Sequence, residues 1–384
     1  MGWRTTALID FYSFTREQLQ NHFVTSRGDS VSIAKLRAGT LMKRVYRSNV
    51  SLFDETVHQD GFSIDFYKWL KLNVNFSFNV QLSEFQRSDS DGTVKFALRL
   101  SDGSLIETVL IPERGRLTLC LSTQVGCAQA CRFCQTGRMG LKRSLTTQEI
   151  VSQVVFVSQW LFQMRNGSQT LADSDWLSQI IGDSPISNLV FMGMGEPLDN
   201  LSAVLPAISI FTDAKGLNLS PRKITVSTVG ILPELEIILN QTNVSLALSL
   251  HFPFDKERSK VMPVNQRFPL ADVLEVLKRN IKRGPYFIQY TLIKGVNDTS
   301  EHAAALTEIL KEIPVKVNLI PLNEHDGAAF RRPDLSSVVR FQNILKSNGL
   351  VTTVRLSKGR DVQAACGQLI QKVQQNKQDS IAVI

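Results

Sequence analysis

The sequence predicts an α/β fold whose parallel strands form a full or partial barrel. Beyond residue 116, short apolar segments of strand length alternate six times with longer segments of helical character. Strands that alternate with helices indicate a parallel sheet, and six repeats fit a barrel better than a short open sheet. The functional groups of such folds lie at the carboxyl ends of the strands, so we expect the site there.

Two segments of different character precede this alternation. Residues 1–90 contain helical segments such as TREQLQNHF and SIAKLRAGTLMKRVY without intervening strands, which predicts a small helical N-terminal accessory domain. In residues 91–115, apolar residues alternate on both sides of the turn SDGS, which carries an Asp-Gly pair. This pattern is typical of a β-hairpin and predicts a hairpin extension beside the barrel.

We assign the barrel to residues 116–350. Its predicted strands are LTLCLSTQVG, NLVFMGMGE, KITVSTVG, VSLALSLH, YFIQYTLI and VKVNLIPLN. The predicted helices are TTQEIVSQVVFVSQWLFQM, LSAVLPAISIFTDAKG, LPELEIILNQ, LADVLEVLKRNIKRG, SEHAAALTEILKE and LSSVVRFQNILKSNG. Thr146 and Glu149 have the spacing of a capping box at the start of the first helix. Residues 165–187 are a polar insertion, and residues 351–384 form a C-terminal segment that we expect to be a loop followed by a helix.

The charge distribution suggests an anionic partner. The chain carries 43 Lys and Arg against 35 Asp and Glu, a formal net charge of +8. Between residues 114 and 148 there is no acidic residue, and the cations there are Arg114, Arg116, Arg132, Arg138, Lys142 and Arg143. A nucleic-acid or phosphate substrate and a simple solvated basic face both fit this pattern. The N-terminus lacks the features of a signal peptide and no apolar run is long enough for a membrane span, so we expect a cytoplasmic protein.

Four of the five cysteines lie within fifteen residues, at positions 120, 127, 131 and 134, and the fifth is Cys366. An odd, clustered set indicates a metal site or catalysis rather than a disulfide scaffold. Structural zinc normally takes four ligands, and Cys120 is the nearest candidate for the fourth. A [4Fe-4S] cluster held by only three thiolates would leave one iron open for a small molecule. At this point both a cluster and a zinc loop remain open.

The spacing C-x3-C-x2-C of Cys127, Cys131 and Cys134 resembles the signature of the radical S-adenosylmethionine (SAM) superfamily. The segments TLCLSTQVGCAQACRFCQTG, FMGMGEPLDN, ITVSTVG, LALSLH, RSKVMPVN, GVNDTSEHA, VNLIPLN and AACGQL together resemble the RlmN/Cfr family, radical SAM enzymes that methylate an adenine ring in RNA. The resemblance spans about residues 92–370 and implies a partial (β/α)6 barrel. It also implies one [4Fe-4S] cluster per chain on these three cysteines, with SAM at the open iron.

The resemblance also implies roles for two further cysteines. Cys366 would take a methyl group from one SAM, and the 5′-deoxyadenosyl radical from a second SAM would remove a hydrogen from that S-methyl group. The methylene radical would then add to the adenine ring. Cys120 would help to resolve the adduct, leaving a transient disulfide with Cys366. Glu107 matches a proton acceptor of the family, and Cys120 and Glu107 remain alternatives for the base.

The same resemblance assigns contacts to SAM, all near the ends of predicted strands. These residues are Gly195, Glu196, Ser227, Ser249, Leu250, His251 and Asn323. The carboxylate of Glu196 is suited to accept hydrogen bonds from the SAM ammonium group.

The leading hypothesis is methylation of adenine C2 in 23S rRNA and, as a second substrate, in tRNA next to the anticodon. The close alternative is the Cfr-like reaction at adenine C8, which gives antibiotic resistance. Val125 and Pro321 favour the C2 branch, whereas Leu322 and the insertion depart from it. A more remote alternative is a zinc-stabilised RNA-binding protein without catalysis. We expect an electron donor of the flavodoxin or ferredoxin type, no membrane partner, an RNA contact in the N-terminal domain and, by default, a monomer.

Overall fold

The computed structural model describes residues 8–47, 61–113, 115–166, 186–324 and 329–369. Most of the predicted insertion and of the predicted C-terminal helix lies outside these residues. At the centre is a ten-stranded sheet in the order β14-β13-β12-β11-β10-β9-β6-β5-β4-β3. Neighbouring strands from β6 to β14 run parallel, and those from β3 to β6 run antiparallel.

The strands of this sheet are β3 (Val80–Arg87), β4 (Val94–Leu100), β5 (Leu105–Glu113), β6 (Arg116–Cys120), β9 (Asn188–Phe191), β10 (Ile224–Thr228), β11 (Ser245–Ser249), β12 (Tyr286–Leu292), β13 (Val315–Pro321) and β14 (Val351–Val354). Two small sheets pair β1 (Ile9–Asp10) with β2 (Val74–Asn75) and β7 (Gln124–Gly126) with β8 (Leu141–Ser144). The six predicted strands correspond to β6 and β9 to β13. The parallel strand β14 and the antiparallel strand β3 were not predicted.

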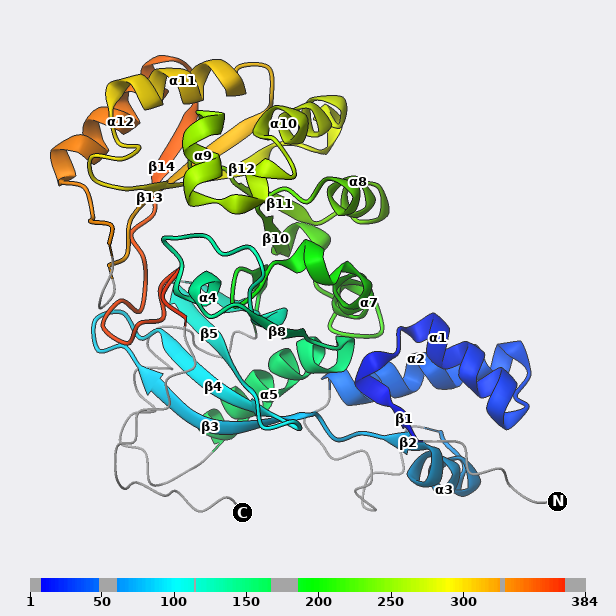
Figure 1. Ribbon diagram of the computed structural model, residues 1–384. Helices are drawn as coiled ribbons and strands as arrows, with labels where there is room; N and C mark the ends of the chain where they lie inside the picture. The colour runs from blue at the N-terminus through cyan, green and yellow to red at the C-terminus, as the bar shows by residue number, and fades with distance from the viewer. Residues whose placement is uncertain (1–7, 48–60, 114, 167–185, 325–328, 370–384) are drawn as a thin grey trace.

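The helices are α1 (Arg16–His22), α2 (Val31–Arg47), α3 (Ile64–Asn73), α4 (Gln135–Arg138), α5 (Thr147–Asn166), α7 (Leu201–Thr212), α8 (Leu232–Gln241), α9 (Asp255–Val261), α10 (Leu270–Arg279), α11 (Ser300–Leu310) and α12 (Leu335–Ser347). Helices α5, α7, α8, α10, α11 and α12 follow parallel strands, as predicted, and cover the outer side of the curved sheet (Figure 1). The edges of the sheet are β14 and β3, so the barrel is partial and the predicted fold class is confirmed.

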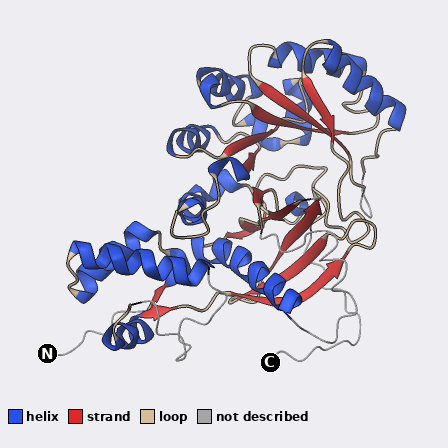
Figure 2. Cartoon of the chain, turned by 180° about the vertical axis from the view of Figure 1, so that it is seen from behind, coloured by secondary structure: helices blue, strands red, loops and turns tan. Residues whose placement is uncertain are grey.

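The helices α1 to α3 lie to one side of the barrel, as both views show (Figures 1 and 2). The side chain of Arg16 pairs with Asp213, just after α7, at 2.8 Å, and Arg47 donates to the Gly216 carbonyl oxygen at 2.9 Å. These contacts fasten the N-terminal helices to the barrel. Among the described residues, no helix combines the length and apolar character needed to cross a membrane.

The start of α5 has the predicted capping box. The Thr146 amide donates to Glu149 Oε2 at 2.9 Å, and the Glu149 amide donates to the Thr146 hydroxyl at 3.2 Å. Each side chain thus satisfies a backbone donor that the first turn of a helix leaves without a partner.

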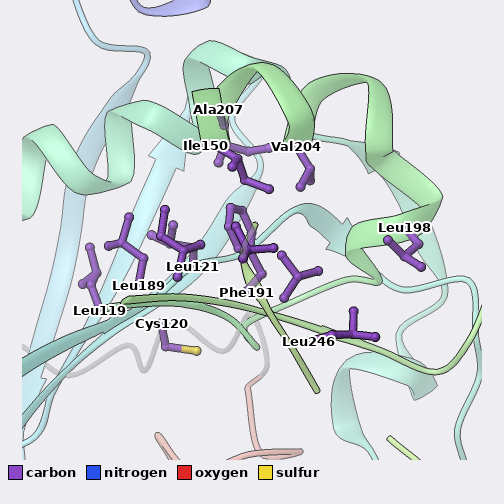
Figure 3. Packing of buried hydrophobic residues seen from close by; sticks show 14 of the residues in the cluster. Leu119, Cys120, Leu121, Ile150, Leu189, Phe191, Leu198, Val204, Ala207 and Leu246 are labelled. Atoms are coloured by element: carbon purple, nitrogen blue, oxygen red, sulfur yellow. The ribbon is translucent and has the colours of Figure 1, made fainter. Parts of the chain in front are cut away.

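Successive side chains at the end of strand β6 point alternately to the helix-packed core and to the inner face of the curved sheet. The side chains of Leu119 and Leu121 point to the side of the strand on which Ile150 of α5 and Val204 of α7 lie, whereas the thiol of Cys120 points to the opposite side (Figure 3). This is the alternation that a strand imposes on successive side chains. It places Cys120 on the face of the sheet opposite the packed helices.

Candidate active site

The cysteine loop follows β7 and ends in the short helix α4. Its three thiols, those of Cys127, Cys131 and Cys134, line one cavity of about 160 Å³. The Cys127 amide donates to the Gly140 carbonyl oxygen at 3.0 Å and ties the loop to the start of β8. Gly126 has a φ of 81°, and a Cβ there would lie 1.9 Å from the same oxygen. Glycine is therefore required at the point where the loop leaves the strand.

The three thiols form a donor set that fits an iron–sulfur cluster. Burial raises the pKa of Cys127 to about 12 and also raises the pKa values of Cys131 and Cys134, and the negative charge of neighbouring thiolates adds to the effect. Three thiolates can share this cavity only beside a compensating cationic centre. A [4Fe-4S] cluster takes each thiolate on a different iron, which suits three thiols spread around one cavity.

Most of the predicted SAM contacts come together on the wall of this cavity. The residues that line it are Gly195, Glu196, Ser227, Ser249, His251 and Asn323, each at or just after the carboxyl end of a strand. Leu250 is not among the described lining residues, because its side chain is fully buried in the core. The ends of β9, β10, β11 and β13 thus meet at one site, as a parallel barrel requires.

Glu196 is a buried carboxylate that is held by two backbone amides. Its Oε1 accepts a hydrogen bond from the Leu198 amide at 3.1 Å, and its Oε2 accepts one from the Val229 amide at 3.0 Å. Burial raises the pKa of Glu196 to about 7, and the hydrogen bonds to Thr228, Val229 and Leu198 oppose that rise only in part. A cationic ligand in the cavity would therefore find an acceptor that is already oriented and poorly solvated.

His251 is buried and has a positive φ of 57°, which is uncommon for a residue with a side chain. The Thr291 amide donates to its Nδ1 at 3.0 Å, so the ring proton resides on Nε2. Burial lowers the pKa of His251 to about 3, and the charge of Arg258 acts in the same direction. The neutral ring packs edge-on against Phe133 of the cysteine loop, with 5.0 Å between the ring centroids.

Two buried amide oxygens on the cavity wall have no hydrogen-bond partner among the described residues. They are Gln289 Oε1 and Asn323 Oδ1. The amide nitrogen of Asn323 donates to the Cys366 carbonyl oxygen at 3.1 Å. An unpaired buried acceptor is costly, so both oxygens are suited to accept from donor groups of a ligand such as hydroxyl or ammonium groups.

Cys366 lies where this cavity meets a second, smaller one. The second cavity, of about 30 Å³, is lined by both Cys120 and Cys366, and Arg355 and Met192 also line both cavities. The pKa of Cys120 is raised to about 12, mainly by burial and also by the nearby Cys366, and the charge of Arg355 opposes this. Two cysteines that lie 246 positions apart in the sequence therefore line one small cavity, beside the site of the three other cysteines.

Known proteins share both the sequence and this architecture. No protein-family model matches the chain. Over 364 residues, 41% are identical to the "Dual-specificity RNA methyltransferase RlmN" of Desulfotalea psychrophila, covering 94% of this chain and 94% of that protein. The chain belongs to the RlmN family. Its structure is similar to a radical SAM methyltransferase from Sphaerobacter thermophilus, with 33% identity, a TM-score of 0.81 and coverage of 94% of this chain and 99% of that one. The resemblance inferred from the motifs is confirmed, and the Cfr-like alternative is not favoured.

Within this RlmN-family chain, Glu107 and Cys120 lie on the same face of the sheet. Val109 on β5 is paired with Cys120 on β6, and Glu107 lies two residues earlier on β5. Glu107 is buried and forms an ion pair with Lys95 on β4, with 3.4 Å between Nζ and Oε1. Among the described residues that line the two cavities, Cys120 is present and Glu107 is not. The structure therefore brings Cys120, rather than Glu107, directly to Cys366.

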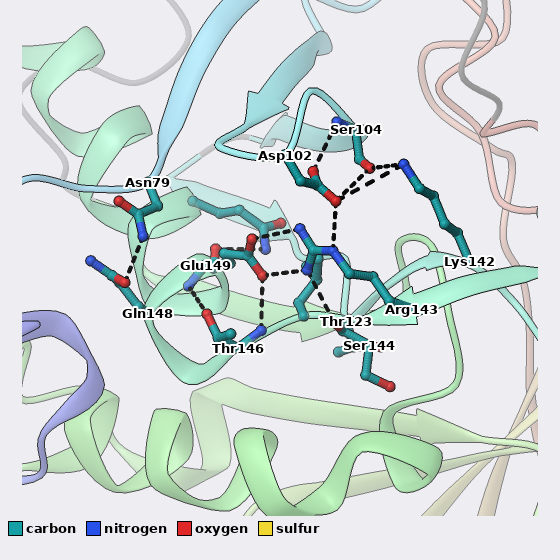
Figure 4. A network of polar contacts seen from close by, with 12 residues as sticks. Asn79, Asp102, Ser104, Thr123, Lys142, Arg143, Ser144, Thr146, Gln148 and Glu149 are labelled. Atoms are coloured by element: carbon teal, nitrogen blue, oxygen red, sulfur yellow. Dashed lines mark hydrogen bonds and ion pairs between the residues drawn. The ribbon is translucent and has the colours of Figure 1, made fainter.

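Half of the predicted basic residues are engaged in ion pairs. Arg143 pairs with Asp102 at 2.9 Å and with Glu149 at 2.8 Å, and Lys142 donates to Ser104 at 2.6 Å and lies near Asp102 (Figure 4). Arg116 pairs with Glu113. These contacts reduce the charge that is available to an RNA.

The other predicted basic residues are not engaged in ion pairs among the described residues. Arg132 and Arg138 are exposed and have no ion pair among the described residues, and Arg114 lies outside them. The two exposed arginines next to the cysteine loop therefore remain the best candidates for phosphate contacts.

Sequence reasoning missed three residues of the RlmN-type site. Gln289 is the central residue of strand β12, which also contains the polar Thr291, so no local signal singled it out as a residue of the cavity wall. Arg355 follows the unpredicted strand β14. Arg258 is fully buried, and its guanidinium donates to the carbonyl oxygens of Leu250 at 3.1 Å and Val229 at 2.7 Å. It thereby ties together the ends of β10 and β11.

Proposed function

We propose that the chain methylates adenine C2 in 23S rRNA, and adenine C2 in tRNA next to the anticodon, through an S-methylcysteine at Cys366. The observation that carries this proposal is the place of Cys366 at the junction of two cavities. The larger cavity is lined by the three clustered cysteines and the buried Glu196, and the smaller cavity is lined by Cys120. A thiol in this position can meet a methyl donor on one side and an RNA base on the other. The name of the relative, a dual-specificity RNA methyltransferase, supports both substrates.

We assign the cofactors to the larger cavity. Cys127, Cys131 and Cys134 would hold one [4Fe-4S] cluster, and SAM would lie beside Glu196 and the unpaired amide oxygens of Gln289 and Asn323. When bound, these groups supply a methyl group and, after reduction, a radical able to remove hydrogen from an S-methyl group. We assign the reduction to an electron donor of the flavodoxin or ferredoxin type.

The chain's own residues orient and shield these groups. Glu196 would be able to accept a hydrogen bond from the SAM ammonium group without losing its contacts to the Leu198 and Val229 amides, since each of its oxygens can accept more than one hydrogen bond. His251 stays neutral and presents its Nε2 proton. Ser227 and Ser249, whose hydroxyl oxygens lie 3.4 Å apart, add further polar groups to the same wall.

Cys120 is suited to complete the reaction next to Cys366. Because burial raises the pKa of Cys120 to about 12, its thiol is protonated at neutral pH and must lose this proton to a base before its sulfur can attack. We assign Cys120 to the resolution of the adduct: its sulfur would form a transient disulfide with Cys366 as the bond between the Cys366 sulfur and the methylene carbon breaks, and a thiol reductant would then restore both cysteines. Glu107, beside Lys95 on the same face of the sheet, remains the alternative acceptor for the ring proton.

The remaining parts of the chain fit an enzyme that binds a large RNA. We assign the helical part of residues 1–90 to an accessory domain that contacts RNA, 116–350 to the radical SAM barrel and 351–384 to the segment that carries the methyl-accepting cysteine. The hairpin extension predicted for 91–115 also includes β3, because Val80–Arg87 pairs with β4 in the central sheet. We further infer a monomer that acts in the cytoplasm, where its RNA substrates are found.

Mass spectrometry of 23S rRNA and tRNA from a deletion strain tests the proposal. We expect 2-methyladenosine to disappear from both and to return with the wild-type gene but not with Cys366→Ala. Loss of 8-methyladenosine instead would assign the reaction to C8, and unchanged methylation would overturn the proposal.

Anaerobic purification gives an independent test of the cofactor. A brown protein with about four iron and four sulfide per chain is expected. A colourless protein that contains zinc would favour the non-catalytic RNA-binding alternative and contradict the proposal.

A further inference from the structure

The segment that carries Cys366 is fastened on its C-terminal side to the cysteine loop. The Gln135 amide donates to the Gly367 carbonyl oxygen at 2.8 Å, and the Thr136 hydroxyl donates to the Leu369 carbonyl oxygen at 2.8 Å. Both donors directly follow Cys134. The chain just after Cys366 is therefore held close to the three clustered cysteines.

On its N-terminal side, the same segment is fastened to the turn between β3 and β4. Asp361 Oδ1 accepts from the Ser88 hydroxyl at 2.7 Å, and Asp361 Oδ2 accepts from the Asp89 amide at 3.1 Å. In return, the Gly359 amide donates to Asp91 Oδ2 at 2.9 Å. We call these five residues the turn latch. Figure 1 shows the segment, in red, beside the cyan strands of this hairpin.

The turn latch is close-packed and charged. Gly359 has a φ of 63°, and a Cβ there would lie 2.8 Å from the Cγ2 of Thr93 and 2.8 Å from the Cβ of Ala364. The pKa of Asp91 is lowered, because hydrogen bonds from Thr93 and Gly359 and the charge of Lys358 outweigh the effect of burial. Asp91 is thus an anion at neutral pH, and charged acceptors form the stronger kind of hydrogen bond.

The latch sets how far Cys366 can move. Cys366 follows Asp361 by five residues. A released chain of that length can reach about 17 Å. The Ala364 amide donates to the Gly359 carbonyl oxygen at 2.8 Å, so the fastened segment is folded back on itself rather than extended. Without the latch, Cys366 would be held only from its own carbonyl oxygen and its C-terminal side, by Asn323, Gln135 and Thr136, and the thiol would be less firmly placed at the wall that the two cavities share.

We propose that Asp361 and Asp91 are positioning residues that hold the Cys366 thiol between the two cavities, so that the β3–β4 hairpin takes part in the reaction. This inference rests on the proposed role of Cys366. It assigns a function to a hairpin turn that touches neither the cysteine cluster nor the predicted SAM contacts.

Hydrogen exchange followed by mass spectrometry tests the inference on the purified holoenzyme. Asp361→Ala removes both acceptor oxygens, and since Asp361 is exposed its replacement leaves the core intact. We expect the amides of Gln363 and Ala364, which are bonded within the segment, to exchange at least about tenfold faster, because two hydrogen bonds to a carboxylate are lost and one such bond alone accounts for about that factor. Exchange in residues 127–139 should stay as in the wild type.

The matched control is Asp102→Ala at the neighbouring turn between β4 and β5. Asp102 bonds to Ser104 and Arg143 but to nothing in residues 359–369. This control should leave the exchange of Gln363 and Ala364 unchanged. Asp361→Asn should restore part of the protection, because an amide oxygen can still accept from the Asp89 amide.

The kinetics of RNA methylation distinguish a loss of Cys366 positioning from a general loss of structure. Asp361→Ala should lower kcat by at least about tenfold, since the same two hydrogen bonds are lost, with the KM for RNA unchanged. The inference would be overturned if the Gln363 and Ala364 amides of Asp361→Ala exchanged at the wild-type rate. It would also be overturned if Asp102→Ala accelerated their exchange as much as Asp361→Ala does. If the wild-type enzyme does not methylate RNA, the proposed function fails, and the exchange data still decide whether the latch holds the segment.

Discussion

The glycine that begins the cysteine loop offers a sharp test of how this loop is held. Gly126 and Gly140 have similar positive φ values, 81° and 70°, but different surroundings. A Cβ at Gly126 would lie 1.9 Å from the Gly140 carbonyl oxygen, whereas a Cβ at Gly140 would have nothing within 4 Å. Alanine at the two positions therefore differs only in the space that the new methyl group meets.

The expected free energies follow from these two environments. Alanine in the left-handed region costs about 1–2 kcal/mol at either position. Gly126→Ala adds about 1–3 kcal/mol for the steric conflict and about 1 kcal/mol for a weakened hydrogen bond between the Cys127 amide and Gly140. We therefore expect a total loss of about 4 kcal/mol for Gly126→Ala, against about 1–2 kcal/mol for Gly140→Ala.

Two measurements check this prediction. Urea unfolding of the apoprotein gives the free energy of unfolding, and iron per chain after anaerobic reconstitution reports on the loop itself. We expect Gly126→Ala to bind little iron and Gly140→Ala to bind nearly as much as the wild type. Equal losses of stability and of iron in both variants would refute the view that the contact between the loop and β8 requires glycine.

Three further predictions concern the site. Cys120→Ala should accumulate protein crosslinked to RNA on denaturing gels, and an absence of crosslink would remove Cys120 from resolution of the adduct. Arg258→Met should lower the free energy of unfolding by about 3–5 kcal/mol, because it removes the buried guanidinium hydrogen bonds to the Leu250 and Val229 carbonyl oxygens and to Asn265 Oδ1; a loss below 1 kcal/mol in urea unfolding would contradict this. Since burial raises the pKa of Glu196 to about 7, its protonated form stabilises the fold at low pH, and this contribution is lost as pH rises from about 4.5 to 7. In urea unfolding of the apoprotein, the free energy of unfolding should be roughly 3 kcal/mol lower at pH 8 than at pH 5, and Glu196→Gln should lack this difference. The same difference in Glu196→Gln would refute the assignment of the pH dependence to Glu196.

Periodicity in the sequence was sufficient for the regular part of the fold. The alternation of apolar strands and helices predicted β6 and β9 to β13, and the spacing of Thr146 and Glu149 predicted the capping box that the structure contains. Strand β14 was missed because Val351–Val354 is short and partly exposed, as edge strands are, so its apolar signal is weak. Strand β3 was missed because several of its residues are polar and exposed.

The residues of the site that belong to sequence motifs could be predicted, whereas those that are brought there only by the packing of the fold could not. The cysteine spacing pointed to the cluster loop, and the structure places those three thiols on one cavity. Gln289 and Arg355 reach the site only through strand pairing, which no local pattern records. The opposite holds for Leu250, which lies next to His251 in the sequence but turns into the core.

The open sheet has a mechanical consequence for the position of Cys366. In the described part of the chain, the outermost parallel strand β14 and the antiparallel extension are joined across the gap by residues 355–369, which form no strand of the sheet. This segment continues no hydrogen-bonded ladder, so the two parts of the sheet are linked here by turn and side-chain contacts such as those of Asp361 and Gly359. We therefore expect local changes in residues 355–369 to alter the position of Cys366 while the ladder of the barrel stays unchanged.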